Sequence, residues 1–151
     1  MINELNDLIM QAMKEHNTTR TETLRAIKTA FMNWETSKEH AGQEMTEADE
    51  IQILKKMVKQ REESADMYQL AHRQDLVDKE IEEANIIKEF LPAEVDDYII
   101  EDAVKWLINP ENPNYFDASK KNMGKIIGDI KKQYPGVDGK RLAQIVQKYL
   151  D

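Results

Sequence analysis

The chain has 151 residues, no cysteine and a formal net charge of −8 at pH 7, and these values exclude several classes of protein. Without cysteine it forms no disulfide, thiolate metal site or cysteine nucleophile, and this composition is typical of a reducing compartment. No segment has the roughly 20 consecutive apolar residues of a membrane span, and the first ten residues lack a signal-peptide pattern, so we expect a cytoplasmic protein without a membrane partner.

Apolar residues spaced three and four apart predict the first three helices. Thr19 and Glu22 form a possible capping box for the second helix, and Thr46 and Asp49 form one for the third. Trp34 ends the apolar stripe of the second helix, where we expect a core or domain-interface residue. The three helices are predicted at about residues 2–13, 19–35 and 47–71.

A fourth helix is predicted from Asp75, its expected cap, to Pro92, because proline disfavours helix at the preceding residue. Its apolar stripe includes Ile81, which we expect to be buried. Arg61 lies in the apolar row of the third helix. We expect it either to pair across the bundle with an acid such as Asp75 or Asp78, or to extend outward along its aliphatic stem.

After Pro92 the elements become shorter. A turn-rich loop with two Asn-Pro pairs separates the first two of three further helices, and Asp138 is the expected cap of the last. Trp106 is expected in the core or at a domain interface. No strand pattern is found, so the predicted fold is all-α, with a bundle of about four helices in residues 1–92 and a small three-helix domain in residues 93–151. The last three helices are predicted at about residues 97–108, 119–134 and 139–150.

The charge is distributed unevenly along the chain. Residues 1–93 hold 12 Lys and Arg against 19 Asp and Glu, a net of −7, and residues 94–117 hold 1 against 7, a net of −6. Residues 118–151 hold 8 against 3, a net of +5. A phosphate backbone would therefore be repelled by most of the chain and attracted to its last 34 residues.

Within this basic segment the lysines fall on one side of the predicted sixth helix. At about 100° per residue, Lys121, Lys125, Gly128 and Lys132 lie within roughly 60° of one another, opposite the isoleucines. Lys140 and Arg141 open the next helix, where free backbone N–H groups suit phosphate oxygens. The candidate nucleic-acid-binding residues are thus Lys121, Lys125, Lys132, Lys140 and Arg141.

Two plainer explanations remain open for these residues. Lysines on the polar side of an amphipathic helix are commonly a solvated surface. The glycines Gly124, Gly128 and Gly139 allow close approach of another backbone, but they also serve helix packing and turns.

The sequence offers no catalytic machinery. Its three serines lie outside any glycine-rich setting, its three histidines are scattered, and no glycine-rich phosphate loop follows a strand. We therefore expect no intrinsic enzymatic activity and predict no catalytic, cofactor-binding or metal-binding residue.

Three segments resemble the YqeY-like protein family. They are "TLRAIKTAF" (residues 23–31), "KQREESADMYQLAHRQDLVDKEIEEANIIKEFLP" (residues 59–92) and "MGKIIGDIKKQYPGVDGKRLAQIVQKYL" (residues 123–150). The sequence departs from the family pattern in "AHR", where a glycine commonly precedes the arginine, and in "NPENPNYFDAS", which is longer than the usual link.

The resemblance implies a helical domain followed by a small three-helix domain. The family is also similar to the carboxyl-terminal tail of one subunit of the tRNA-dependent Asp/Glu amidotransferase, where the tail helps to hold tRNA and amide transfer occurs in other domains. Through this similarity, family members carry the label of carbon–nitrogen ligase with glutamine as amido-N-donor, which is an analogy from a shared module.

Three functional hypotheses follow. The first is a non-catalytic module that binds tRNA or another structured RNA through the basic carboxyl-terminal helices. The second is an adaptor whose acidic helical bundle recognises a basic or helical protein partner. The third is an accessory factor of a glutamine-dependent tRNA amidotransferase.

Overall fold

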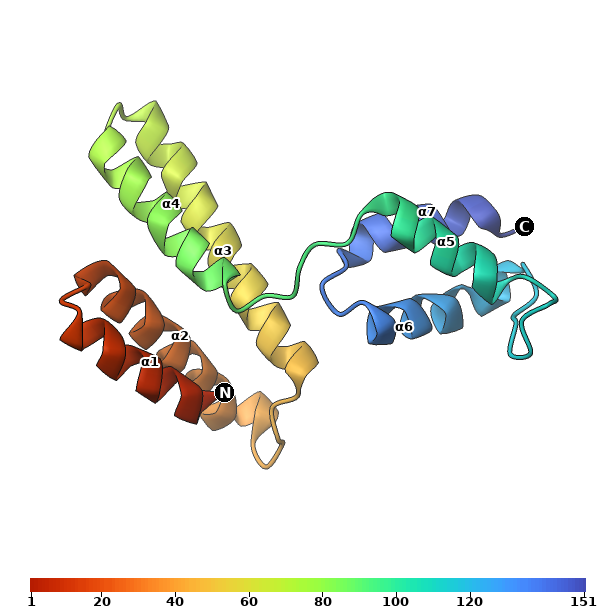
Figure 1. Ribbon diagram of the computed structural model, residues 1–151, viewed down its shortest axis with the longest axis horizontal. Helices are drawn as coiled ribbons and strands as arrows, with labels where there is room; N and C mark the ends of the chain where they lie inside the picture. The colour runs from red at the N-terminus through yellow and green to blue at the C-terminus, as the bar shows by residue number, and fades with distance from the viewer. The chain divides into compact units, whose positions relative to one another are not determined.

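The structure, a computed structural model, describes residues 1–151 and contains no strand, so the all-α prediction is confirmed (Figure 1). The chain divides into two compact units, unit 1 (Met1–Leu91) and unit 2 (Pro92–Asp151). Unit 1 contains α1 (Ile2–Lys14), α2 (Thr18–Thr36), the 3-10 helix η1 (Lys38–His40), α3 (Glu47–Leu70) and α4 (Gln74–Lys88). Unit 2 contains α5 (Asp97–Leu107), the 3-10 helix η2 (Lys120–Asn122), α6 (Met123–Gln133) and α7 (Gly139–Tyr149). No helix is both long enough and apolar enough to cross a lipid bilayer.

Unit 1 is built from two helical hairpins, α1 with α2 and α3 with α4, and α2 also packs against α4 (Figure 1). The apolar stripes read from the sequence form its core, because residues three and four apart share one face of a helix. Its fully buried side chains are Leu5, Leu24, Ile27, Phe31, Leu54 and Ile87.

The helix starts follow local capping chemistry. Thr46 and Asp49 form the predicted capping box of α3, with Thr46 N donating to Asp49 Oδ2 at 2.9 Å and Asp49 N donating to Thr46 Oγ1 at 3.2 Å. The predicted box at Thr19 is wrong. Asn17 caps α2 instead, since its Oδ1 accepts a hydrogen bond from Arg20 N at 3.0 Å and the helix has already begun at residue 18.

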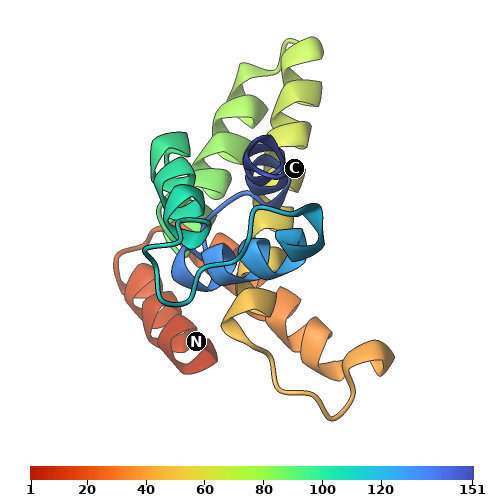
Figure 2. The same ribbon diagram turned by 90° about the vertical axis from the view of Figure 1, so that its right-hand side faces the viewer.

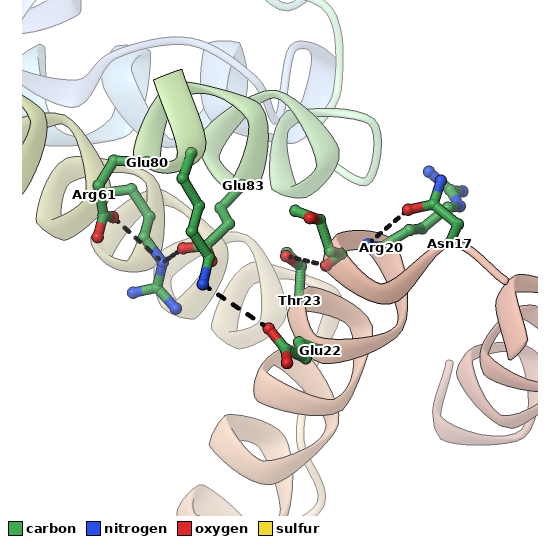
Figure 3. A network of polar contacts seen from close by, with 9 residues as sticks. Asn17, Arg20, Glu22, Thr23, Arg61, Glu80 and Glu83 are labelled. Carbon is green, nitrogen blue, oxygen red and sulfur yellow. Dashed lines mark hydrogen bonds and ion pairs between the residues drawn. The ribbon is translucent and has the colours of Figure 1, made fainter. Parts of the chain in front are cut away.

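Arg61 pairs across the α3–α4 hairpin, but with different acids from those expected. Its Nε lies 3.0 Å from Glu83 Oε2 and 4.0 Å from Glu80 Oε2 (Figure 3). Asp75 and Asp78 belong to the first turns of α4, near the hairpin turn, and therefore lie too far along the helix to reach Arg61. The side chains keep only 25% exposure for Arg61, 19% for Glu80 and 15% for Glu83, so the pair is largely removed from water.

Helix α4 also differs from its prediction. Arg73, not Asp75, occupies the N-cap position, and Asp75 instead accepts hydrogen bonds from the Arg73 guanidinium. The helix ends at Lys88, because the next three residues make tighter turns with hydrogen bonds to carbonyls three residues back. Ile81 is 46% exposed, so its expected burial is wrong.

Unit 2 is a three-helix arrangement with its own core, whose fully buried side chains include Ile100, Val104, Ile126, Ile130, Leu142, Ile145 and Val146. Gly136 is required by close packing: a Cβ there would lie 2.6 Å from the Ala93 carbonyl oxygen. The first residues of unit 2 therefore pass directly over the turn between α6 and α7. The loop between α5 and α6 lies toward the viewer in Figure 2.

Candidate nucleic-acid interface

Two of the candidate lysines project from the exposed side of α6. Lys125 and Lys132 are exposed and form no ion pair, while Ile126 and Ile130 on the opposite side of the helix are fully buried. The apolar side of this short helix is fixed by the core of unit 2. Seven residues make almost two full turns, so the two ammonium groups emerge on the same side of α6.

The two glycines of α6 do not serve helix packing. A Cβ built at Gly124 or Gly128 would meet no atom within 4 Å, so both positions are open. The exposed backbone of α6 can therefore be approached closely at Gly128, between Lys125 and Lys132. This observation excludes helix packing as the role of Gly124 and Gly128.

Lys121 does not continue the regular face of α6, contrary to the prediction of one helix from residue 119. It lies in η2, where the turn is tighter and the angle of about 100° per residue no longer applies. Its Nζ lies 3.9 Å from Asp117 Oδ2, with 75% of the lysine side chain and 61% of the aspartate side chain exposed. Hydrogen bonding from Ser119 and the charge of Lys121 hold the pKa of Asp117 below its usual value. Such exposed pairs are weak, so Lys121 remains available to another anion.

Arg141 is already engaged within unit 2. Its Nε donates to Asp97 Oδ2 at 3.1 Å and its Nη2 bonds the same carboxylate, which joins α7 to α5. This contact lowers the pKa of Asp97 and raises the pKa of Arg141. Of the five candidate residues, Arg141 is thus the one with a clear structural partner.

One backbone N–H group at the start of α7 is also already hydrogen-bonded within the chain. Asp138 caps the helix as predicted, and its Oδ1 accepts a hydrogen bond from Lys140 N at 3.0 Å. The backbone N–H of Lys140 is therefore used, but its exposed side chain forms no ion pair. A Cβ at Gly139 would lie 3.5 Å from Lys131 Nζ, so the ammonium group of Lys131 at the end of α6 reaches the first residue of α7, next to Lys140 in the chain.

Lys131 is a residue that the sequence reasoning missed. It is exposed and forms no ion pair, and it links the lysines of α6 to those of α7. Lys131 lies about 120° from Lys125 around the helix axis and was therefore left out of the predicted lysine stripe. It is nevertheless adjacent to Lys132 in the sequence. We call Lys125, Lys131, Lys132 and Lys140 the basic surface. Asp129, also exposed on α6, offsets part of its charge.

Comparison with known protein families matches residues 2–150 to the family described as Yqey-like protein. The chain belongs to the YqeY-like family. A search of the curated proteins finds no match. The family match covers both units.

The YqeY-like chain presents a group of lysine ammonium groups at this surface. Lysine ammonium groups on flexible stems attract anions as point charges and do not fix them in one geometry. No group of three or more His, Asp or Glu side chains in the structure could hold a metal ion. The arrangement is therefore suited to holding an extended anion.

Proposed function

We propose that this YqeY-like chain is a non-catalytic module that binds structured RNA, most specifically tRNA, through the basic surface. The observation that carries the proposal is the set of exposed ammonium groups on α6 and α7 that form no ion pair with a carboxylate of the chain. They lie in the only one of the three charge segments with a net positive charge, +5 over residues 118–151. The negative charge of the remaining segments repels a polyanion and so favours its approach to residues 118–151.

The contacts are with phosphate and with RNA shape rather than with base identity. Lysine lacks the planar fork with which arginine reads bases, and the only arginine of this region, Arg141, is bonded to Asp97. The open backbone at Gly128 lets a sugar–phosphate chain approach α6 between Lys125 and Lys132. Binding of this kind is insensitive to sequence and sensitive to salt.

Transfer RNA is the favoured RNA because of the family relationship. The family resembles the tail of an amidotransferase subunit that helps to hold tRNA, and double-helical RNA is recognised mainly by shape and backbone. The charge distribution supports a polyanion as the ligand, and the family resemblance supports tRNA among the possible polyanions.

A gel-shift titration of the full chain with total tRNA at low salt tests the proposal. We expect retardation that is abolished in the double variant Lys125→Glu with Lys132→Glu. The matched control is Lys14→Glu with Lys56→Glu, which makes the same change in net charge at two exposed lysines of unit 1 that form no ion pair. The control should still retard tRNA. If the unmodified chain does not retard tRNA at low salt, the proposal is wrong.

A second candidate function is supported by the surface of unit 1. Several large apolar side chains are exposed there, including Met67 at 72%, Leu70 at 82% and Ile81 at 46%. Methionine-rich surfaces adapt to protein partners, and the net charge of −7 favours a basic one. A pull-down that returns one stoichiometric protein, unchanged by nuclease treatment, would support this adaptor function over RNA binding.

A further inference from the structure

Two aromatic side chains are half exposed in the part of unit 2 where α5 ends and the loop to η2 begins. Trp106, in the last turn of α5, was expected in the core or at a domain interface; it is 52% exposed, so the core alternative is wrong. Tyr115, in the loop, is 48% exposed. Each ring therefore has a substantial area in water while the rest of the residue is anchored in the fold.

One buried residue, Asn112, is hydrogen-bonded to the backbones of both aromatic residues. Asn112 is only 6% exposed, and its Nδ2 donates to the Trp106 carbonyl oxygen at 3.0 Å. The carbonyl oxygen of Asn112 accepts a hydrogen bond from Tyr115 N at 3.1 Å. The backbones of Trp106 and Tyr115 are thus both bonded to the same residue.

A second hydrogen bond fixes the loop against the end of α5. Phe116 N donates to the Leu107 carbonyl oxygen at 2.7 Å, and these residues directly follow Tyr115 and Trp106 in the chain. The two aromatic residues therefore lie on adjacent segments that are bonded to each other. Because both backbones are fixed in this way, ordering them on ligand binding costs little conformational entropy.

The same loop connects the aromatic residues to the lysines. Asn122 Nδ2 donates to the Asp117 carbonyl oxygen at 3.1 Å and to its carboxylate at 2.9 Å, which fastens the end of the loop to η2. Lys121 approaches the same carboxylate at 3.9 Å, and α6 with its basic surface follows directly. The loop that carries Tyr115 therefore leads to Lys121, four residues before Lys125, the first lysine of the basic surface.

We propose that the corner formed by Trp106, Tyr115 and Lys121 binds unpaired RNA bases, which stack on the two rings while Lys121 contacts a flanking phosphate. This inference rests on the proposed function and deepens it, because it specifies RNA with unpaired nucleotides. Stacking on an aromatic side chain accepts any base, since every base has a π-face.

The chain segment around the rings carries no net attraction for phosphate. Asp102 and Glu111 are exposed there beside a single lysine, Lys105, so an uncharged base is favoured over a phosphate at the rings. Phosphates are held by Lys121 and the basic surface, where the net charge is positive. An exposed Trp–Tyr pair also suits a protein partner, and the neighbouring ammonium groups favour RNA.

The fluorescence of Trp106 provides a direct test. The chain has two tryptophans, and Trp34→Phe leaves Trp106 as the only one while keeping an aromatic ring against His40, on which Trp34 stacks with ring centroids 4.1 Å apart. The full chain carrying Trp34→Phe is titrated with tRNA, with a single-stranded oligoribonucleotide, and with a fully paired RNA duplex of equal phosphate number. We expect quenching of Trp106 by the first two and not by the duplex.

Affinity for the single-stranded oligoribonucleotide gives a second readout. Trp106→Ala and Tyr115→Ala should each weaken binding by about 5- to 150-fold, the equivalent of ~1–3 kcal/mol per stacked base. The matched control is Tyr98→Ala, which removes an aromatic side chain that is 63% exposed on α5, eight residues before Trp106. The control should bind as the unmodified chain does, and thermal unfolding should show all three variants folded.

The outcomes separate this inference from the proposed function. If Lys125→Glu with Lys132→Glu abolishes tRNA binding while the emission of Trp106 does not respond to RNA, the corner is not a base site and the proposed function stands. Equal losses for Trp106→Ala and Tyr98→Ala, or no loss for either corner variant, would also overturn the inference. If neither tRNA nor the oligoribonucleotide binds the unmodified chain, both proposals fail.

Discussion

Replacing Arg61 with methionine tests how the α3–α4 hairpin is held together. The substitution keeps the length and apolar stem of the side chain but removes the charge that faces Glu80 and Glu83 across the hairpin. The two carboxylates would then be left close together with little exposure to water. Unit 1 should therefore become less stable.

The expected loss follows from the burial of the three side chains. Removing one partner of a fully buried ion pair costs about 3–5 kcal/mol, and exposed pairs contribute about 0–1 kcal/mol. Because Arg61, Glu80 and Glu83 keep 25%, 19% and 15% exposure, we expect unfolding of unit 1 to cost ~2–3 kcal/mol less in the variant. This corresponds to a decrease of roughly 1–2 M in the urea midpoint.

The assay is urea unfolding followed by the fluorescence of Trp34, which reports on unit 1 when Trp106→Phe removes the tryptophan of unit 2. The control is Lys59→Met, at a lysine that is 76% exposed and lies 4.0 Å from Glu63, which should change stability by less than about 0.5 kcal/mol.

A rescue variant separates lost charge from lost packing. Adding Glu80→Met and Glu83→Met to Arg61→Met replaces the whole network with apolar side chains and should restore most of the stability. If Arg61→Met costs no more than Lys59→Met, or if the rescue variant is as unstable as Arg61→Met alone, the reasoning is refuted.

Three further predictions concern local contacts. Because Arg141 lowers the pKa of Asp97, this pair stabilises unit 2 above about pH 4 and loses its effect as the pH falls through the lowered pKa. The Tm difference between the unmodified chain and Asp97→Asn should therefore be constant above about pH 4 and shrink below it. A difference that grows on acidification would contradict this prediction. Gly136→Ala should destabilise unit 2 in thermal unfolding, since its Cβ would lie 2.6 Å from the Ala93 carbonyl oxygen, and an unchanged Tm would show that the turn can move. Thr46→Ala should cost ~1 kcal/mol in urea unfolding through loss of the α3 cap, whereas no loss would mean that the cap is dispensable.

Much of the fold could be predicted from the sequence, because the positions of the helices depend on apolar spacing and local caps. The box of Thr46 and Asp49 and the cap at Asp138 were predicted correctly. Asn17 was missed because it competes with Thr19 for the same role, and capping preferences do not distinguish two good caps two residues apart. The end of α4 was placed too late because Pro92 limits a helix but does not prevent it from ending earlier.

The features that depend on contacts between helices were harder to predict. The partner of Arg61 depends on where α4 begins, since a shift of a few residues exchanges Asp75 and Asp78 for Glu80 and Glu83. Trp106 lies roughly 120° around α5 from the stripe of Ile100, Val104 and Leu107, so its exposure agrees with helical spacing. The expectation of a core position came from the residue type and not from the periodicity.

The candidate site was predicted in part. Lys125 and Lys132 are exposed and without an ion pair, whereas Arg141 is bonded to Asp97 through a contact 44 residues apart in the sequence. Lys121 lies in a 3-10 turn that helical-wheel geometry cannot anticipate. RNA binding by these residues stays a prediction.

The salt dependence of tRNA binding tests the central claim most directly. The slope of log Kobs against log salt concentration is measured for the full chain, for Lys125→Gln with Lys132→Gln, and for the control Lys14→Gln with Lys56→Gln. We expect a steep negative slope for the full chain and the control, and a slope shallower by about 1.4–1.8 for the variant of the basic surface. Equal slopes for all three proteins would contradict the assignment of phosphate contacts to α6.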